Sequence, residues 1–277
     1  MDQLSTGKKV NKPSDDPVVA MKGMDYRTQV TEVEQYQRNI SEVHNWMDSS
    51  DSSLDKATQA LQRLRELAVQ GSNDTFEAGQ RGNIASEVDQ LKEHLVEIAN
   101  TKVNNKYIFN GTHTTGSVNG NGEVTPPVTM DPQGVVNSVS ASTDAVLIEV
   151  SAGTKLDVNI NPTKVFGNDL FADIEAFSTA LKGNNPEQIS QSISNIDNHI
   201  NNVVNQRADL GARMNRLDLI ENRVAEQEIS AKKMMSENED ADMEKVIMNL
   251  TTQESIHRAA LSAGSRIIQP TLLDFLR

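Results

Sequence analysis

The sequence of 277 residues contains no cysteine, few aromatic residues and no long apolar run. The absence of cysteine excludes disulfide bonds and thiolate metal sites. Aromatic residues make up 4% of the chain and hydrophobic residues 36%, which is low for a compact enzyme and typical of extended helical proteins with narrow cores. Because no stretch of about 18 consecutive apolar residues occurs, the sequence predicts no insertion into a membrane.

Basic residues are also scarce, with 26 Lys and Arg against 39 Asp and Glu and a formal net charge of −13. Binding to nucleic acid generally needs a basic face that contacts phosphates, so no nucleic-acid partner is expected. The N-terminus carries neither the basic region nor the apolar region of a secretory signal peptide. That absence is compatible with export by a route that needs no cleaved signal.

The N-terminal part of the chain has helical periodicity. A first helix is predicted to begin within residues 14–17, where Ser14 or Asp15 could cap its first turn and Pro17 suits its start. A second cluster of capping residues at 49–53 precedes another run of apolar residues spaced by three and four. We assign residues 1–109 to the N-terminal half of a helical rod.

The most regular apolar stripe lies between residues 189 and 224, with an average step of 3.5 residues. This step predicts a helix from Pro186 to about residue 236 that packs against partner helices. A shorter helix is predicted from Asp169 to Leu181, and residues 168–237 form the C-terminal half of the rod. We assign packing roles in this stripe to Ile193, Ile196, Ile200, Val203, Leu210, Leu217 and Val224.

Residues 238–277 form a predicted amphipathic assembly segment, which opens with the acidic stretch 239–242. Its apolar side chains recur at helical spacing and continue into an apolar tip. The residues assigned to packing or assembly here are Ile247, Leu250, Leu261, Ile268, Leu272, Leu273, Phe275 and Leu276.

Between the two helical halves the sequence changes character. Residues 110–167 contain many Gly, Pro and Asn residues that separate short β-branched runs, such as 146–150 and 156–160. Turn signals between short alternating runs predict a small β domain. The predicted fold is therefore mainly α, with a long antiparallel helical bundle formed by both chain ends and a β-rich inserted domain.

No residue pattern supports catalysis or a cofactor. Glu254 and His257 have the spacing of one half of a di-iron carboxylate site, but the second such pair is missing from the sequence. The five histidines are scattered and show no zinc-binding spacing. We therefore assign no catalytic, cofactor-binding or metal-binding residue, and a helical-bundle carboxylate metalloprotein is kept only as an alternative.

With these motifs in view, the chain resembles the flagellin superfamily. The resemblance is carried by residues 4–20 at one end, by 215–217 and 239–242 in the other helical half, and by 270–277 at the C-terminus. Residues 13–20, the stretch 107–112 leading into the insert, and the terminal eight residues are most similar to members that join the hook to the filament. Both helical halves take part, and the insert contributes little.

The resemblance implies a structural subunit of the bacterial flagellum that is not an enzyme. It implies an extracellular location after export by the flagellar type III system without a cleaved signal peptide. The implied partners are hook-associated protein 1, flagellin, other copies of this chain, and a cytoplasmic export chaperone of the FlgN type on the C-terminal segment. The main alternative within the family is a flagellin that builds the filament itself.

One departure from the family pattern concerns the N-terminus. Members usually have an apolar helical segment before the Leu-Ser-Thr-Gly motif, and this chain begins almost at that motif, at Leu4. We therefore expect the segment from about Asp242 onward to lack a partner within the chain and to be mobile or prone to aggregation in the isolated monomer.

Overall fold

The computed structural model describes residues 2–73, 78–118 and 124–268. The chain divides into two compact units: Met1–Gln35 with Val224–Arg277, and Tyr36–Arg223. These units cut across the four segments predicted from the sequence. The predicted boundaries follow changes in composition, whereas the units follow contacts, and two long helices run through both units. Within the described residues, no helix has the length and hydrophobicity needed to cross a membrane.

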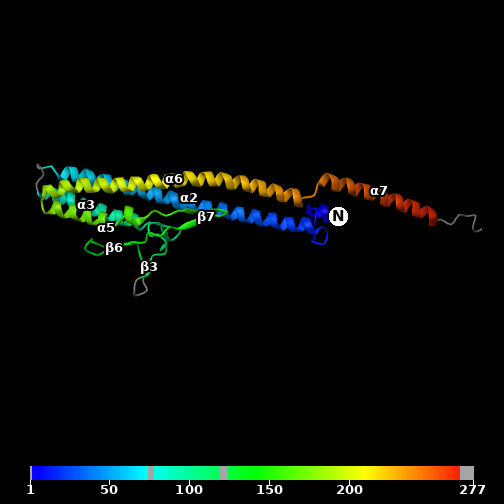
Figure 1. Cartoon of the computed structure of the whole chain (residues 1–277), viewed down its shortest axis with the longest axis horizontal. Coiled ribbons are helices and arrows are strands. Elements are labelled where there is room, and N and C mark those ends of the chain that lie inside the picture. The colour runs from blue at the N-terminus through cyan, green and yellow to red at the C-terminus, as the bar shows by residue number, and fades with distance from the viewer. Residues whose placement is uncertain (1, 74–77, 119–123, 269–277) are drawn as a thin grey trace, which may run out of the picture. The chain divides into compact units, whose positions relative to one another are not determined.

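Helices dominate the fold, as predicted (Figure 1). In chain order they are α1 (Asp2–Thr6), α2 (Pro17–Gly71), α3 (Ala78–Ala99), α4 (Pro162–Val165), α5 (Asn168–Lys182), α6 (Pro186–Glu239) and α7 (Met243–Ile268). The predicted short helix therefore corresponds to α5 and the predicted long helix to α6. Their ends lie within a few residues of the predicted ones.

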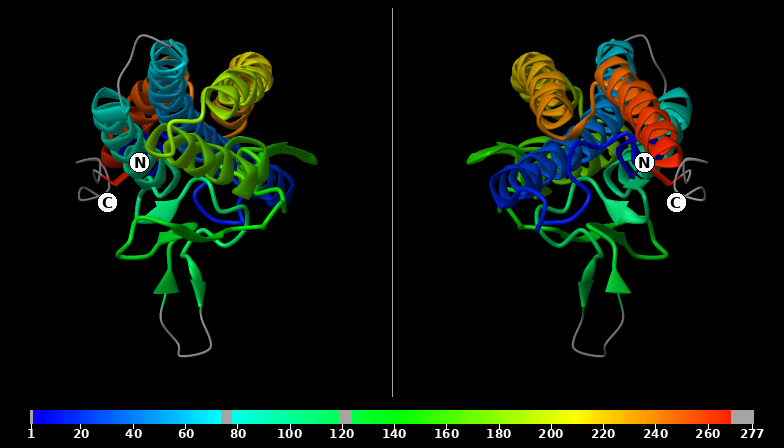
Figure 2. Two further views of the ribbon diagram at one scale, coloured as in Figure 1. Left: turned by 90° about the vertical axis from the view of Figure 1, so that its left-hand side faces the viewer. Right: turned by 90° about the vertical axis from the view of Figure 1, so that its right-hand side faces the viewer.

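The inserted strands form four separate antiparallel pairs, with no larger sheet among the described residues (Figure 2). The pairs are β1 (Lys102–Val103) with β2 (Lys106–Tyr107), β3 (Ser117–Val118) with β4 (Val124–Thr125), β5 (Val128–Met130) with β6 (Val136–Val139), and β7 (Leu147–Ser151) with β8 (Thr154–Asp157). The fold class is confirmed, and the β region is a series of hairpins.

The first hairpin begins before the predicted insert. Between β1 and β2 lie Asn104 and Asn105, with φ angles of 49° and 64°. Asparagine tolerates this left-handed conformation better than other non-glycine residues, and two such residues make the tight turn that suits a twisted hairpin. The predicted insert begins only at residue 110, after this hairpin, because Lys102–Tyr107 contains no glycine or proline to indicate a turn.

The start of α2 differs in detail from the prediction. The carboxylate Oδ1 of Asp16 accepts hydrogen bonds from the amides of Val18 and Val19, at 3.0 and 3.1 Å. Asp16 is therefore the capping residue, because Pro17 occupies the first helical position and the cap directly precedes it. Asp15 instead accepts from the Lys12 amide at 3.1 Å and closes the preceding turn.

The serine-rich stretch 49–53 does not begin a new helix, because α2 continues through it to Gly71. The hydroxyls of Ser49, Ser50 and Ser53 donate to the backbone carbonyls four residues earlier, at 2.7–2.8 Å. Serine side chains can cap a helix or bond back to it, and the choice depends on whether the preceding turn is already helical. Here the buried side chains on both sides keep the helix continuous.

The predicted stripe on α6 is buried at every seventh position. Leu217 and Val224 are fully buried, and the exposed fractions of Ile196, Val203 and Leu210 are 1–2%. The intervening Ile193 and Ile200 are only half-buried. Ser192 and Ile220 add buried positions, but elsewhere in the stripe only one residue in seven is buried, which indicates a narrow core between packed helices.

Within the unit Tyr36–Arg223, ion pairs at the edge of this core set the register of α2 against α6. The Arg207 guanidinium bonds Asp51 through Nε at 3.0 Å and Asp55 through Nη1 at 2.8 Å. In the same unit, α3 packs along α5, and Phe109 meets Phe166 edge to face with ring centroids 5.0 Å apart. Arg207 therefore links α6 to α2 from the edge of the core, where its side chain is 29% exposed.

Replacing Leu217 with Asp should destabilise the helical packing strongly. Burying a leucine contributes about 1.5–3 kcal/mol and an unpaired buried charge costs more, so we expect a loss above about 3 kcal/mol. The matched control is Leu219→Asp on the same helix, because Leu219 is 72% exposed. Thermal unfolding followed by circular dichroism measures both variants, and equal melting temperatures for them would contradict this packing.

Candidate functional site at the joined chain ends

The segments at the two ends of the chain pair through their backbones. The Lys9 amide donates to the Glu239 carbonyl at 2.7 Å, and the Ala241 amide donates to the Gly7 carbonyl at 2.8 Å. Lys8 and Asp240 lie opposite each other as an antiparallel bridge. Gly7 has a φ of 67°, a left-handed conformation that favours glycine. We call the pairing of residues 7–9 with 239–241 the terminal clasp.

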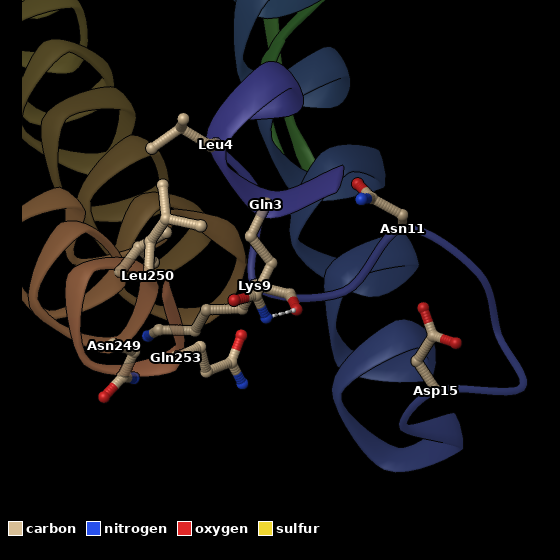
Figure 3. Close-up of a pocket in the computed structure, with 9 residues that line it drawn as sticks. Gln3, Leu4, Lys9, Asn11, Asp15, Asn249, Leu250 and Gln253 are labelled. Carbon is tan, nitrogen blue, oxygen red and sulfur yellow. Dashed lines mark hydrogen bonds between the residues drawn. The ribbon is translucent and has the colours of Figure 1, made fainter. Parts of the chain in front are cut away.

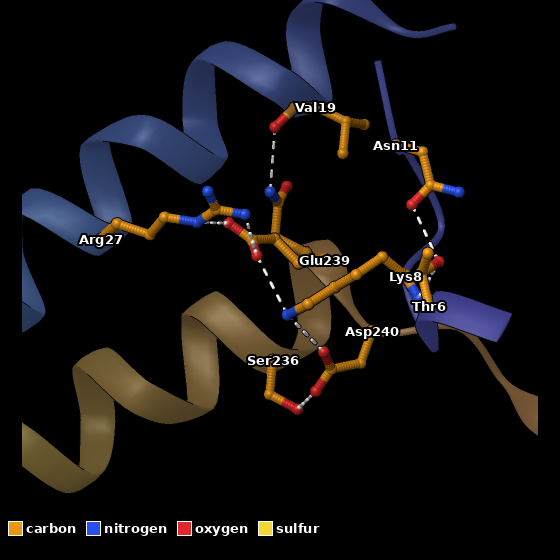
Figure 4. Close-up of polar contacts among 9 residues, drawn as sticks. Thr6, Lys8, Asn11, Val19, Arg27, Ser236, Glu239 and Asp240 are labelled. Atoms are coloured by element: carbon orange, nitrogen blue, oxygen red, sulfur yellow. Dashed lines mark hydrogen bonds and ion pairs between the residues drawn. The ribbon is translucent and has the colours of Figure 1, made fainter. Parts of the chain in front are cut away.

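The side chain of Glu239 lies at the centre of the clasp and is 8% exposed (Figure 4). Arg27 on α2 donates to both its carboxylate oxygens, from Nε and Nη2, at 2.7 Å each. Lys8 adds a third bond, from Nζ to Oε2, at 3.1 Å. Two parallel N–H···O bonds from one guanidinium to a carboxylate combine strength with a defined geometry.

Neighbouring groups complete the polar network. The carboxylate of Asp240 accepts from the Ser236 hydroxyl at 2.6 Å and from Lys8 Nζ at 2.9 Å. Asn238 donates its amide to the backbone carbonyl of Val19 at 3.0 Å. These contacts hold the end of α6 against residues near the start of α2 within one unit.

The network shifts the acidity of its members. Hydrogen bonding from Arg27, more than that from Lys8, lowers the pKa of Glu239 even though burial opposes the shift. The bonds from Ser236 and Lys8 lower the pKa of Asp240. In return, Asp240 and then Glu239 raise the pKa of Lys8. All three groups are therefore held in their charged forms at neutral pH.

Close approach in the clasp depends on a glycine of α2. A Cβ atom added at Gly23 would lie 2.8 Å from Oε1 of Glu239, closer than side-chain atoms normally approach. Sequence reasoning pointed to both chain ends but did not identify Arg27 or Gly23 as parts of the site. The contact between the two chain ends could have been predicted from the charge complementarity of two pairs in the sequence, the basic Lys8–Lys9 and the acidic Glu239–Asp240.

The short helix α1 gives the beginning of α7 a partner. In the same unit, Leu4 of α1 faces Leu250 across an open cleft of about 450 Å³, which Gln3, Val246 and Asn249 also line (Figure 3). Val246 and Leu250 are half-buried. The expectation that the segment after Asp242 has no partner within the chain is therefore wrong for its first turns.

Beyond Leu250, α7 is exposed from Thr251 to Ala263. Ile247 is 49% exposed and Leu261 62%, although both belong to the predicted packing stripe. Nothing is described of the Ile268 side chain, and Leu272, Leu273, Phe275 and Leu276 lie outside the described residues. An amphipathic helix gains most of its stability by burying its apolar face, and the described part of this chain covers only the beginning of that face.

Glu254 and His257 also lie on this exposed helix. Glu254 faces Arg258, with 3.9 Å between carboxylate and guanidinium. Neither residue belongs to a group of three or more metal-ligand side chains in the part of the chain that the structure describes.

Replacing Glu239 with Gln should weaken the clasp in a pH-dependent way. The lowered pKa means that the carboxylate stabilises the fold above its ordinary value of 4.5, and that this contribution is lost as the pH falls through the lowered value. At neutral pH we expect a loss of about 1–3 kcal/mol in local stability.

Hydrogen exchange at the amides of Lys9 and Ala241 measures this loss directly. The difference between Glu239→Gln and the parent should shrink as the pH is lowered below the ordinary carboxyl range. The control is Glu237→Gln, because the Glu237 side chain is 69% exposed. A constant difference at all pH values would contradict the role assigned to the charge.

Hydrogen exchange on the dilute monomer should also separate two parts of α7. Amides near Val246 and Leu250 should show modest protection because α1 packs there, and those from Thr251 to Gly264 should exchange rapidly. Protection of the second stretch comparable to that of α6 would mean that the exposed helix has a further stabilising partner.

Comparison with known proteins identifies the family of this chain. Models for the N-terminal and C-terminal helical regions of bacterial flagellin match residues 1–114 and 193–276. The flagellar hook-associated protein 3 of Salmonella typhimurium is 27% identical, with 94% of this chain and 86% of that protein aligned. The flagellin of Listeria monocytogenes is 28% identical, with 99% of this chain and 90% of that protein aligned.

Solved structures show the same fold. A putative flagellar hook-associated protein from Vibrio parahaemolyticus superposes with a TM-score of 0.72 at 21% identity, covering 82% of this chain and all of the other. The two flagellin models together match more than half of this chain, and they match both helical halves that meet in the terminal clasp. The chain belongs to the bacterial flagellin family.

Proposed function

We propose that this chain is a structural subunit of the bacterial flagellum that forms the junction between hook-associated protein 1 and the flagellin filament. The observation that carries the proposal is the uncovered apolar face of α7, which begins directly after the terminal clasp in a chain of the flagellin family. A helix whose apolar side chains remain exposed in the monomer is suited to packing against neighbouring subunits. The alignment with hook-associated protein 3 supports the junction over other positions in the flagellum.

The exposed side chains can supply substantial assembly energy. Ile247 is 49% exposed and Leu261 62%, and burying such a side chain fully contributes about 1.5–3 kcal/mol. Packing of several copies of α7 against one another would bury these residues together. On this proposal the predicted assembly residues contact other subunits; they are Ile247, Leu250, Leu261, Ile268, Leu272, Leu273, Phe275 and Leu276.

The same surface requires protection before assembly. An exposed amphipathic helix promotes aggregation at high concentration, so a cytoplasmic export chaperone of the FlgN type would bind it. We infer export through the flagellar type III system without a cleaved signal peptide, followed by contact with hook-associated protein 1 on one side and flagellin on the other. Flagellins are structural proteins, and we infer the same non-enzymatic role here.

A second candidate function is that of a flagellin, the bulk subunit of the filament. It is supported by the Listeria flagellin, which aligns over almost the whole chain. The two functions differ in copy number and location: a junction subunit occupies one short zone, whereas a flagellin occupies the length of the filament.

Deleting the gene in its source bacterium tests the proposal. If the chain forms the junction, the cells should retain hooks, lose filaments and release flagellin into the medium. Gold labelling of a tagged, functional copy should mark one zone at the end of the hook. Labelling along the filament would support the flagellin candidate, and normal filaments without the gene would contradict both.

Complementation with single variants tests the role of α7. Leu261→Asp should fail to restore filaments, because it places a charge on the apolar face. Thr252→Asp is the matched control, since helical periodicity puts residue 252 on the opposite face of α7. Equal restoration by both variants would contradict an assembly role for this face.

A further inference from the structure

Three potential metal ligands from two helices converge in the unit Tyr36–Arg223. His44 lies on α2, and Asp218 and Glu221 lie on α6. The His44 Nε2 atom is 3.0 Å from Glu221 Oε2 and 3.8 Å from Asp218 Oδ1. The three ligand atoms lie within 4.8 Å of one another, and no other group of three such residues occurs in the part of the chain that the structure describes.

Buried neighbours anchor the backbone that carries these side chains. Val43 and Met47 flank His44 and are fully buried, while Leu217 and Ile220 flank Asp218 with exposed fractions of 0% and 6%. The helices therefore carry the ligands on backbones anchored in the core. Asp218 and Glu221 are three residues apart, which puts both carboxylates on the same side of α6.

Among the described residues, no lysine or arginine forms an ion pair with either of the two carboxylates. Like charges three residues apart on a helix repel each other. Nearby acids on α2 are neutralised, since Arg207 bonds Asp51 and Asp55. Among the ion pairs of the described residues, Asp218 and Glu221 meet only the imidazole of His44. The site thus offers two negative charges and one nitrogen ligand to a cation.

We propose that His44, Asp218 and Glu221 bind one divalent transition-metal ion of the Zn²⁺ type and thereby link α2 to α6. One imidazole nitrogen with two carboxylate oxygens suits Zn²⁺, whereas Ca²⁺ and Mg²⁺ take mainly oxygen ligands. The Asp218 and Glu221 side chains are 59% and 53% exposed, so they can adjust to the ion and leave room for water as a fourth ligand.

The ligand state follows from the chemistry of imidazole. Nε2 must present its lone pair to the metal, so the ring proton resides on Nδ1, and the hydrogen bond to Glu221 is replaced by metal coordination. Sequence patterns do not predict this site, because the histidine lies 177 residues from Glu221 and shows no zinc-binding spacing.

Isothermal titration of the tag-free full chain with ZnCl₂, after removal of metals with a chelator, tests the proposal. The parent should bind one ion per chain, and His44→Ala should weaken binding by at least about tenfold. The matched control is His94→Ala, because His94 has only one carboxylate nearby, Glu97 at 3.6 Å. Glu221→Gln should weaken binding as well, while circular dichroism verifies that each variant is folded.

A second measurement locates the ion. Co²⁺, which is paramagnetic and takes similar ligands, should broaden the amide signals around residues 44 and 218–221 in the parent and leave them sharp in His44→Ala. An affinity unchanged in His44→Ala, an equal loss in His94→Ala, or broadening elsewhere would overturn the site. The absence of Zn²⁺ binding by the parent would show that the three side chains form only an imidazole–carboxylate contact.

Discussion

The terminal clasp depends on the desolvated carboxylate of Glu239. Removing a carboxylate from water is unfavourable unless charged donors replace the lost hydration, and here Arg27 and Lys8 do so. These donors come from different parts of the N-terminal segment, so satisfying one charge joins three stretches of chain. The Lys9 amide donates to the Glu239 carbonyl and the Ala241 amide to the Gly7 carbonyl, and α7 begins at Met243, two residues later. The clasp around this buried charge therefore leads directly into α7.

The long helices provide a narrow core rather than a wide one. Residues every seven positions along α6, such as Leu210 and Leu217, are buried, while the positions between them are partly open. This arrangement explains why a chain with so few aromatic residues can still fold. It also leaves polar pairs at the edge of the core to set the register, as Arg207 does with Asp51 and Asp55.

An assembly protein of this family must combine two opposite properties. Its helices must be stable enough to present a defined surface, yet part of its apolar face must remain uncovered for its neighbours. The terminal clasp and the buried apolar stripe of α6 supply the first property. In the proposed function, exposed residues of α7, including Ile247 and Leu261, would supply the second. The proposed metal site would strengthen the helix pairing without touching the exposed face, because its ligands lie on α2 and α6.

Periodicity and turn chemistry in the sequence were sufficient to predict the helical class, the approximate ends of α5 and α6, and the presence of an inserted β region. These features depend on local order along the chain, such as the repeat through Ile196, Val203 and Leu210. Details set by contacts between distant residues were not predictable. The contact of Arg27 with Glu239 is one such detail. The cap of α2 by Asp16, in place of Ser14 or Asp15, is by contrast a local contact that the prediction missed.

The sequence by itself determined which segments are helical and which faces are apolar, because both follow from residue spacing. Tertiary structure alone decided which charges meet. Gly23 and Arg27 lie on one turn of α2 and are more than 200 residues from Glu239. Glu254 and His257 have the spacing of a motif, yet they join no group of three metal-ligand side chains among the described residues. Pairing of charges depends on how two helices are aligned, to within one turn, and that alignment is a property of the packed core rather than of either helix.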